Sequence, residues 1–206
     1  MPSGKNLRLI AAVAALCGAM QAAVVWDNGP ANPYGGYNAT ATVLADDFVL
    51  AEQTTIRSAA IWAGDKLFGN GIEYAFYSGG EVPGALIAAG MNTVVYTSDP
   101  SYASMYMVSF DLISPVTLED SNYWFSVRER NATQFLSVAV YMTDRVTGRV
   151  PHQRFVGEAS WFNSGGPYDV AFRLDDAQVV PEPRSAYLLF TAGLAFALTS
   201  RRRRAV

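Results

Sequence analysis

The chain has 206 residues, of which 50% are hydrophobic and 16% are charged. This balance is too apolar for a disordered protein and too interrupted by polar residues for a membrane protein with many spans, so we expect one globular domain between the two ends. From Val24 to Val180 the sequence carries eight basic and seventeen acidic residues, a net charge of -9. Such an acidic surface repels phosphate backbones, and no nucleic-acid partner is expected.

Residues 1–23 have the three regions of a secretory signal peptide. Lys5 and Arg8 form its positive region, residues 9–16 form its apolar region, and small residues up to Ala23 offer cleavage sites. We therefore expect export of the chain, with cleavage after Ala23.

Period-two alternation dominates the body, as where Ile72, Tyr74 and Phe76 alternate with their neighbours. Clusters of Gly, Pro, Asn, Asp and Ser interrupt it at short intervals. We expect strands over 43–50, 54–63, 71–78, 92–97, 103–112, 122–129, 136–142 and 169–174. Many short strands without a helical period predict an all-β fold, an antiparallel β-sandwich of jelly-roll type, over residues 24–178.

Few residues suit catalysis or metal binding. Cys17, the one cysteine, lies in the signal peptide, so the mature chain lacks a cysteine nucleophile, a thiolate metal site and disulfides; lipid attachment there would need a small residue in place of Leu16. His152 is the one histidine, and without a Gly-x-Ser-x-Gly elbow it is expected to be a surface residue. No nucleotide-binding loop is present.

Carboxylates leave two possibilities open. A facing pair would suffice for glycoside hydrolysis, although sequence spacing does not tell which acids face each other. Asp46–Asp47 and Asp175–Asp176 offer oxygen ligands for calcium, while solvated strand ends are the simpler interpretation. We expect no bound metal or other cofactor, calcium being the one candidate.

Aromatic residues divide into two groups. Trp62, Phe76 and Trp124 fall within expected strands, where packing in the core explains them. Other rings lie beside Gly, Pro or Ser, where they can stack on sugars or cover the ends of the sandwich. These candidate sugar-stacking residues are Tyr34, Tyr37, Tyr102, Trp161 and Tyr168.

The last segment, residues 179–206, has three parts. Pro181, Glu182 and Pro183 precede an apolar run over 186–198, which the arginines Arg201, Arg202, Arg203 and Arg204 follow. A helix over residues 185–200 would span about 24 Å, against roughly 30 Å of hydrocarbon, so we expect one marginal transmembrane helix. The arginines are expected to stay cytoplasmic by the positive-inside rule, which places the body across the membrane.

These three parts, in this order, resemble the PEP-CTERM sorting signal. The resemblance implies export in a Gram-negative bacterium, processing by an inner-membrane exosortase near Pro181-Glu182-Pro183, and association with exopolysaccharide. The expected location is the inner membrane during sorting, then the cell surface or the extracellular matrix. A plain tail anchor would explain the arginines but not the Pro-Glu-Pro. For the body we expect a noncatalytic matrix protein, the alternatives being a secreted carbohydrate-binding module and a glycan-active enzyme.

Overall fold

A computed structural model describes residues 23–177, except 40–41, 65–70, 101, 103, 130–138, 145 and 147. Over these residues the chain forms thirteen strands and no helix. The described part therefore offers no helix that is long and apolar enough to cross a membrane. The signal peptide before Ala23, the Pro181–Pro183 motif and Arg201–Arg204 lie outside the described residues.

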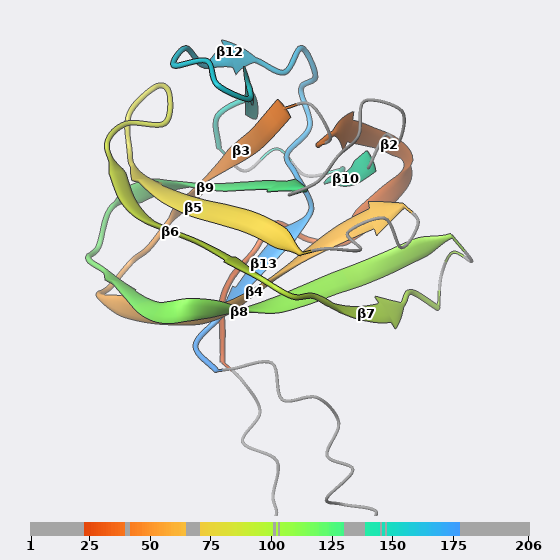
Figure 1. Ribbon diagram of the computed structural model, residues 1–206, viewed down its shortest axis with the longest axis horizontal. Helices are drawn as coiled ribbons and strands as arrows, with labels where there is room; N and C mark the ends of the chain where they lie inside the picture. Colours follow the sequence, from red (N-terminus) through yellow and green to blue (C-terminus); the bar gives the residue numbers. More distant parts are fainter. Residues whose placement is uncertain are drawn as a thin grey trace, which may run out of the picture.

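Seven strands form the first antiparallel sheet, in which β4 (Thr54–Gly64) is central (Figure 1). One side of β4 pairs with β8, and the other pairs with β13 and then with β10. The remaining members are β1 (Val24–Asp27), β2 (Ala31–Asn38), β7 (Val95–Ser98), β8 (Met105–Leu118), β10 (Ala139–Thr143) and β13 (Phe172–Asp175).

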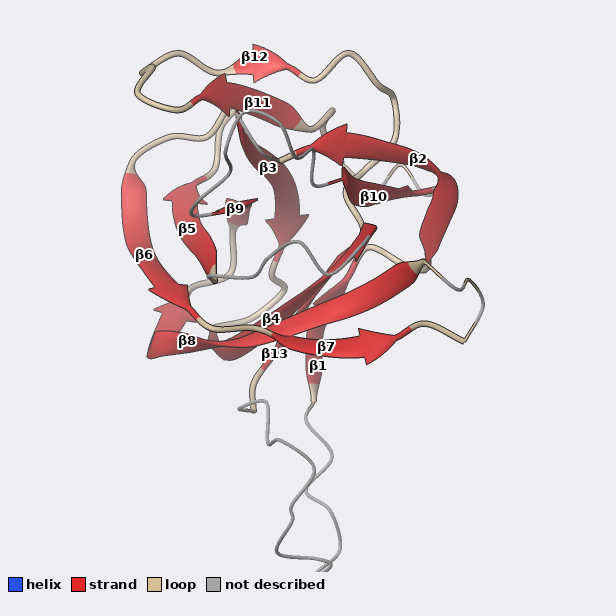
Figure 2. Cartoon of the chain, turned by 45° about the vertical axis from the view of Figure 1, so that its right-hand side comes forward, coloured by secondary structure: helices blue, strands red, loops and turns tan. Residues whose placement is uncertain are grey.

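Six strands form the second antiparallel sheet, in the order β12-β11-β3-β9-β5-β6. Their bounds are β3 (Thr42–Val49), β5 (Ile72–Ser78), β6 (Leu86–Asn92), β9 (Asn122–Glu129), β11 (His152–Phe155) and β12 (Phe162–Asn163). Figure 2 shows β11 and β12 at one edge of this sheet and β6 at the other.

The main core lies between the two sheets, because inward side chains of both contribute to one buried cluster. Phe48 of the second sheet is fully buried, and its ring centroid lies 6.3 Å from that of Phe172 in the first sheet. Phe48 also contacts Phe76 of β5, at 6.2 Å. Residues of the main core alternate along these strands with residues of the opposite face, such as Ala75 and Trp124, which accounts for the period of two in the sequence.

The expected all-β antiparallel architecture is confirmed, and several strands agree closely with expectation, such as Ile72–Ser78 and Asn122–Glu129. The expected end of one strand at residue 112 is wrong. Strand β8 continues to Leu118 past Pro115, because an irregularity in its pairing with β4 absorbs residues 112–115 between the partners of Ile56 and Ser58.

The expectation of a single strand over 92–97 is also wrong, because the chain passes from one sheet to the other within this range. Strand β6 ends at Asn92 in the second sheet, and β7 starts at Val95 in the first. Five strands were not expected from the sequence at all: β1, β2, β6, β11 and β12. The 136–138 part of the expected strand 136–142 lies outside the described residues.

The two ends of the described domain lie side by side on β1 and β13. The backbone nitrogen of Asp176 donates to the carbonyl of Ala23, at 3.2 Å. The nitrogen of Ala23 in turn donates to the Asp176 carboxylate, at 2.8 Å. Both ends thus leave the domain at one place.

Candidate functional site

A groove of about 690 Å³ lies on the outer face of the second sheet, the face turned away from the main core. Its floor consists of small residues that are neighbours across three strands: Ser126 of β9 pairs with Ala75 of β5, which pairs with Ala89 of β6. Because larger side chains would fill this row, the small ones leave the hollow. Its volume is within the range of ligand-binding clefts in proteins.

Charged residues form one flank of the floor. Glu73 and Arg128 are cross-strand partners, and their side chains form an ion pair with an Nε–Oε2 distance of 2.5 Å. The hydrogen bond to Glu73 raises the pKa of Arg128. These two residues neutralise each other within the groove.

Aromatic residues form the opposite flank. Trp161, from the loop between β11 and β12, packs on a small cluster of Ala45, Ala75, Tyr77 and Trp124. Its ring meets that of Tyr77 edge to face, with centroids 5.6 Å apart and planes at 82°. Tyr77 lines the groove, and the partly exposed Trp161 contacts it from beside the lining.

Arg154 of β11 closes the groove between the aromatic and the charged flanks. Its Cζ lies 4.7 Å from the centroid of the Trp161 ring, a cation–π contact. Its Nε is buried and makes no hydrogen bond, and no carboxylate of a described residue lies within ion-pair distance. The groove therefore contains a guanidinium without a counter-charge among the described residues.

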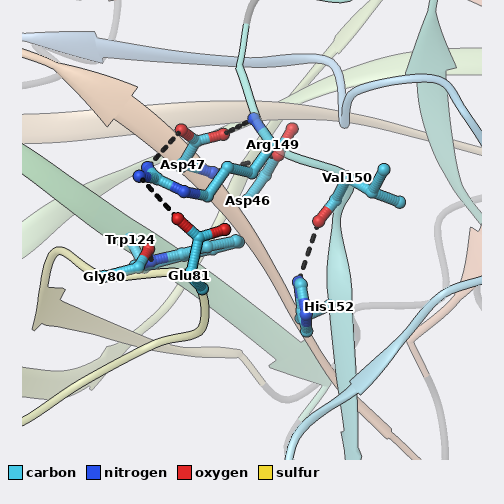
Figure 3. Close-up of polar contacts among 8 residues, drawn as sticks. All are labelled: Asp46, Asp47, Gly80, Glu81, Trp124, Arg149, Val150 and His152. Carbon is cyan, nitrogen blue, oxygen red and sulfur yellow. Dashed lines mark hydrogen bonds and ion pairs between the residues drawn. The ribbon is translucent and has the colours of Figure 1, made fainter.

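An ion network covers the neighbouring end of the same face (Figure 3). Arg149 lies 3.5 Å from a carboxylate oxygen of Asp47 and 3.6 Å from one of Glu81, while its backbone nitrogen donates to Asp47 at 2.7 Å. Below it, the indole of the fully buried Trp124 donates to the carbonyl of Gly80. These contacts attach the β5–β6 loop to the sheet, so that the groove ends here.

His152 takes a structural role within the same face. Its ring stands edge to face against Trp124, with centroids 5.1 Å apart. Its Nδ1 lies 2.8 Å from the carbonyl of Val150, and because a carbonyl only accepts, Nδ1 donates this bond. No serine hydroxyl of a described residue is bonded to the ring, so a catalytic triad has no support here.

Two buried aspartates lie beside each other on opposite faces of β3. Burial is the main cause of the raised pKa of Asp46, which lies inside the main core; the charge of Asp169 adds to it. Burial also raises the pKa of Asp47, although Arg149 lowers it again. Asp46 accepts from Val170, and Asp47 is paired to Arg149, so both are engaged within the protein.

The other candidate calcium ligands are also engaged within the protein. The expectation of solvated aspartates is wrong here, because Asp175, like the two aspartates of β3, is buried. Asp175 pairs with Arg173, with an oxygen 3.0 Å from its Nε, and Asp176 binds the nitrogen of Ala23. Over the described residues, no group of three or more Asp, Glu, His or Cys side chains has the arrangement that a metal needs. Glu73 is the one carboxylate among the described residues that line the groove.

The five candidate sugar-stacking residues lie in different places. Trp161 is not among the residues that line the groove but contacts one of them, Tyr77. Tyr34 is 88% exposed and meets Tyr102 edge to face, at 6.3 Å, on another part of the surface. Tyr37 is only 7% exposed and belongs to the main core, where its hydroxyl donates to the carbonyl of Tyr168. Tyr168 itself is exposed.

Most groove residues were missed by sequence analysis. Arg128 and Ser126 occupy alternate positions of the expected strand 122–129, which places them on one face, but the sequence does not say that this face is hollow. Arg154 lies in a strand of four residues that was not expected. Tyr77 was part of an expected strand but was assigned no function.

Comparisons with known proteins give no assignment for the chain. No protein-family model, no curated protein and no solved structure matches it. The groove is therefore the basis on which a function can be inferred.

Proposed function

We propose that this is an exported cell-surface or extracellular-matrix protein that is sorted and processed by exosortase and binds exopolysaccharide through its β-domain. The β-domain is a noncatalytic binding domain in this proposal. The protein contacts the inner membrane only transiently, during sorting. The observation that carries the binding function is the open groove on the second sheet, which Tyr77 and Arg154 line and whose Arg154 is stacked on the Trp161 ring.

The shape and the chemistry of the groove support a sugar chain as ligand. A row of small residues crosses three strands, so an extended polymer can lie across the sheet. Tyr77 in the lining and the partly exposed Trp161 beside it offer aromatic surface to the apolar side of a sugar ring. Glu73, Ser126 and Arg128 offer hydrogen-bonding groups for hydroxyls.

Binding without catalysis is supported by the carboxylates. Hydrolysis of a glycosidic bond generally requires two carboxyl groups across one cleft. Among the described groove residues only Glu73 is acidic, and its side chain is engaged in an ion pair with Arg128. The body in this proposal is a jelly-roll-like β-sandwich, which the shared core of the two antiparallel sheets supports.

Binding can be tested by affinity electrophoresis of the purified protein through gels that contain extracellular polysaccharides. Ala89→Trp places a large ring on the exposed floor of the groove and should abolish retardation. Trp161→Ala should weaken binding about tenfold, which is the loss of one stacking contact. Thr97→Trp, on the exposed face of β7 in the other sheet, is the matched control and should bind normally.

Retardation that is equal in Ala89→Trp, Trp161→Ala and the control would refute binding in the groove. Sorting is tested separately, by mass spectrometry of the protein released from its native host. Processing predicts a C-terminus that lacks Arg201–Arg204; a mature chain that still ends at Val206 would contradict it.

A further inference from the structure

We propose that the polysaccharide is acidic and that Arg154 binds the carboxylate of a uronic acid residue next to Trp161. This inference rests on the proposed function and specifies the class of its ligand. It starts from the one charge in the groove that the described residues do not balance.

The two arginines of the groove differ in their partners. Arg128 is held by Glu73 through a short ion pair, so its charge is compensated. Arg154 has no such partner among the described residues, and its guanidinium lies over the Trp161 ring. Counting Glu73, Arg128 and Arg154, the described lining of the groove has a net charge of about +1, within a body whose net charge is -9.

The position of Arg154 restrains its guanidinium before a ligand arrives. The residue pairs with Val43 in the sheet, which fixes its backbone, and the Trp161 ring covers the guanidinium on one side. A guanidinium that is stacked in this way still presents N–H groups along its edge, in a planar fork that matches a carboxylate. The bond between the two would be charge-assisted and directional.

The desolvation of Arg154 also favours an anionic ligand. Part of the Arg154 guanidinium is withdrawn from water, since its Nε is buried without a hydrogen bond. A charge in such a place is unfavourable until a counter-charge joins it. An anionic ligand supplies that counter-charge, whereas a neutral sugar does not.

The ligand class can be tested with polygalacturonate, the same polymer after its carboxyl groups have been reduced to alcohols, and dextran sulfate. Isothermal titration with the purified protein should show polygalacturonate binding roughly 10- to 100-fold more tightly than the reduced polymer. Arg154→Gln should remove this difference by weakening only the binding of polygalacturonate. Arg57→Gln removes the same charge from an exposed position of β4 in the other sheet, and should change neither affinity.

The outcomes separate the proposals. If polygalacturonate and its reduced form bind with equal affinity and Arg154→Gln changes neither, the proposal of an acidic ligand is overturned. If Ala89→Trp still abolishes the binding of both polymers, the groove remains the binding site. Equal weakening by Arg57→Gln and Arg154→Gln would show attraction of any polyanion and would also overturn it. Tighter binding of dextran sulfate that depends on Arg154 would refute the carboxylate and assign a sulfate ester. Binding of no polymer would refute the proposed function itself.

Discussion

Replacing Asp46 by alanine should test how the two sheets are held together. One carboxylate oxygen of Asp46 accepts hydrogen bonds from the backbone nitrogen of Val170, at 2.6 Å, and from the amide of Asn28, at 3.1 Å. Asp46 belongs to β3 of the second sheet, whereas Val170 and Asn28 adjoin β13 and β1 of the first. The carboxyl group is thus a buried polar link across the core.

The magnitude follows from what the substitution leaves behind. Asp46→Ala removes the acceptor of the Val170 nitrogen inside the core, which costs about 1–3 kcal/mol for an unsatisfied donor. The amide of Asn28 keeps its bond to the carbonyl of Val170, so there the loss is that of one hydrogen bond, about 1 kcal/mol. We expect a destabilisation of about 2–4 kcal/mol at pH 4.

The pH dependence has a definite sign. The pKa of Asp46 is well above the usual 3.8 in the folded protein, so the folded state binds the proton more tightly than the unfolded state does. The associated stability is fully present below about pH 4 and is lost as the pH rises through the folded pKa. As the pH rises from the unfolded towards the folded pKa of Asp46, the wild type loses about 1.4 kcal/mol of stability per pH unit through this group. Asp46→Ala lacks the group and does not lose this stability. The stability difference between the wild type and Asp46→Ala should therefore shrink from pH 4 to pH 8.

Urea unfolding of the purified protein, followed by tryptophan fluorescence at several pH values, measures this difference. Asp120→Ala, at an exposed turn, is the matched control and should stay within about 0.5 kcal/mol of the wild type. A difference for Asp46→Ala that grows with pH would refute the reasoning, because it would mean that burial does not favour the protonated carboxyl group.

Three further substitutions test the packing by the same unfolding measurement. Phe48→Ala should cost about 3–5 kcal/mol, because this fully buried ring joins aromatic residues of both sheets, and a loss under 1 kcal/mol would contradict the shared core. Tyr74→Phe should cost about 1–3 kcal/mol, because the backbone nitrogen of Ile113 donates to that hydroxyl; no change would show that water replaces it. Gly71→Ala should cost at least about 1–2 kcal/mol, because φ is +112° and a Cβ would lie 2.7 Å from the carbonyl oxygen of Asn92; an unchanged midpoint would exclude this turn.

The fold class could be predicted from the sequence because alternation reflects the pleat of each strand. This worked best in β5 and β9, where inward residues such as Phe76 and Phe125 enter the main core. It worked poorly in β2, whose Pro33, Gly35 and Gly36 are typical of loops. Tertiary pairing with β10 overrides these local preferences.

The groove could not be predicted, because it depends on which strands are neighbours. Arg154 reaches the face that carries Ser126 only because β11 pairs with β3, with Arg154 opposite Val43. These residues are far apart in the sequence, and no local pattern encodes that register. The loop environment of Trp161 made it a candidate for sugar stacking or for covering the end of the sandwich, but its neighbours Tyr77 and Arg154 are set by the fold.

The adjacent ends on β1 and β13 determine how the domain would respond to mechanical force. A force that pulls Ala23 and Asp176 apart would break the β1–β13 hydrogen bonds one after another, starting at the end nearest these two residues. A force applied between the groove and Asp176 would instead act across the core and along the β13–β4 pairing. The hydrogen bonds of this pairing, from Phe172 to Asp175, would resist it together. A bound polymer would therefore pull against the stronger direction of the domain.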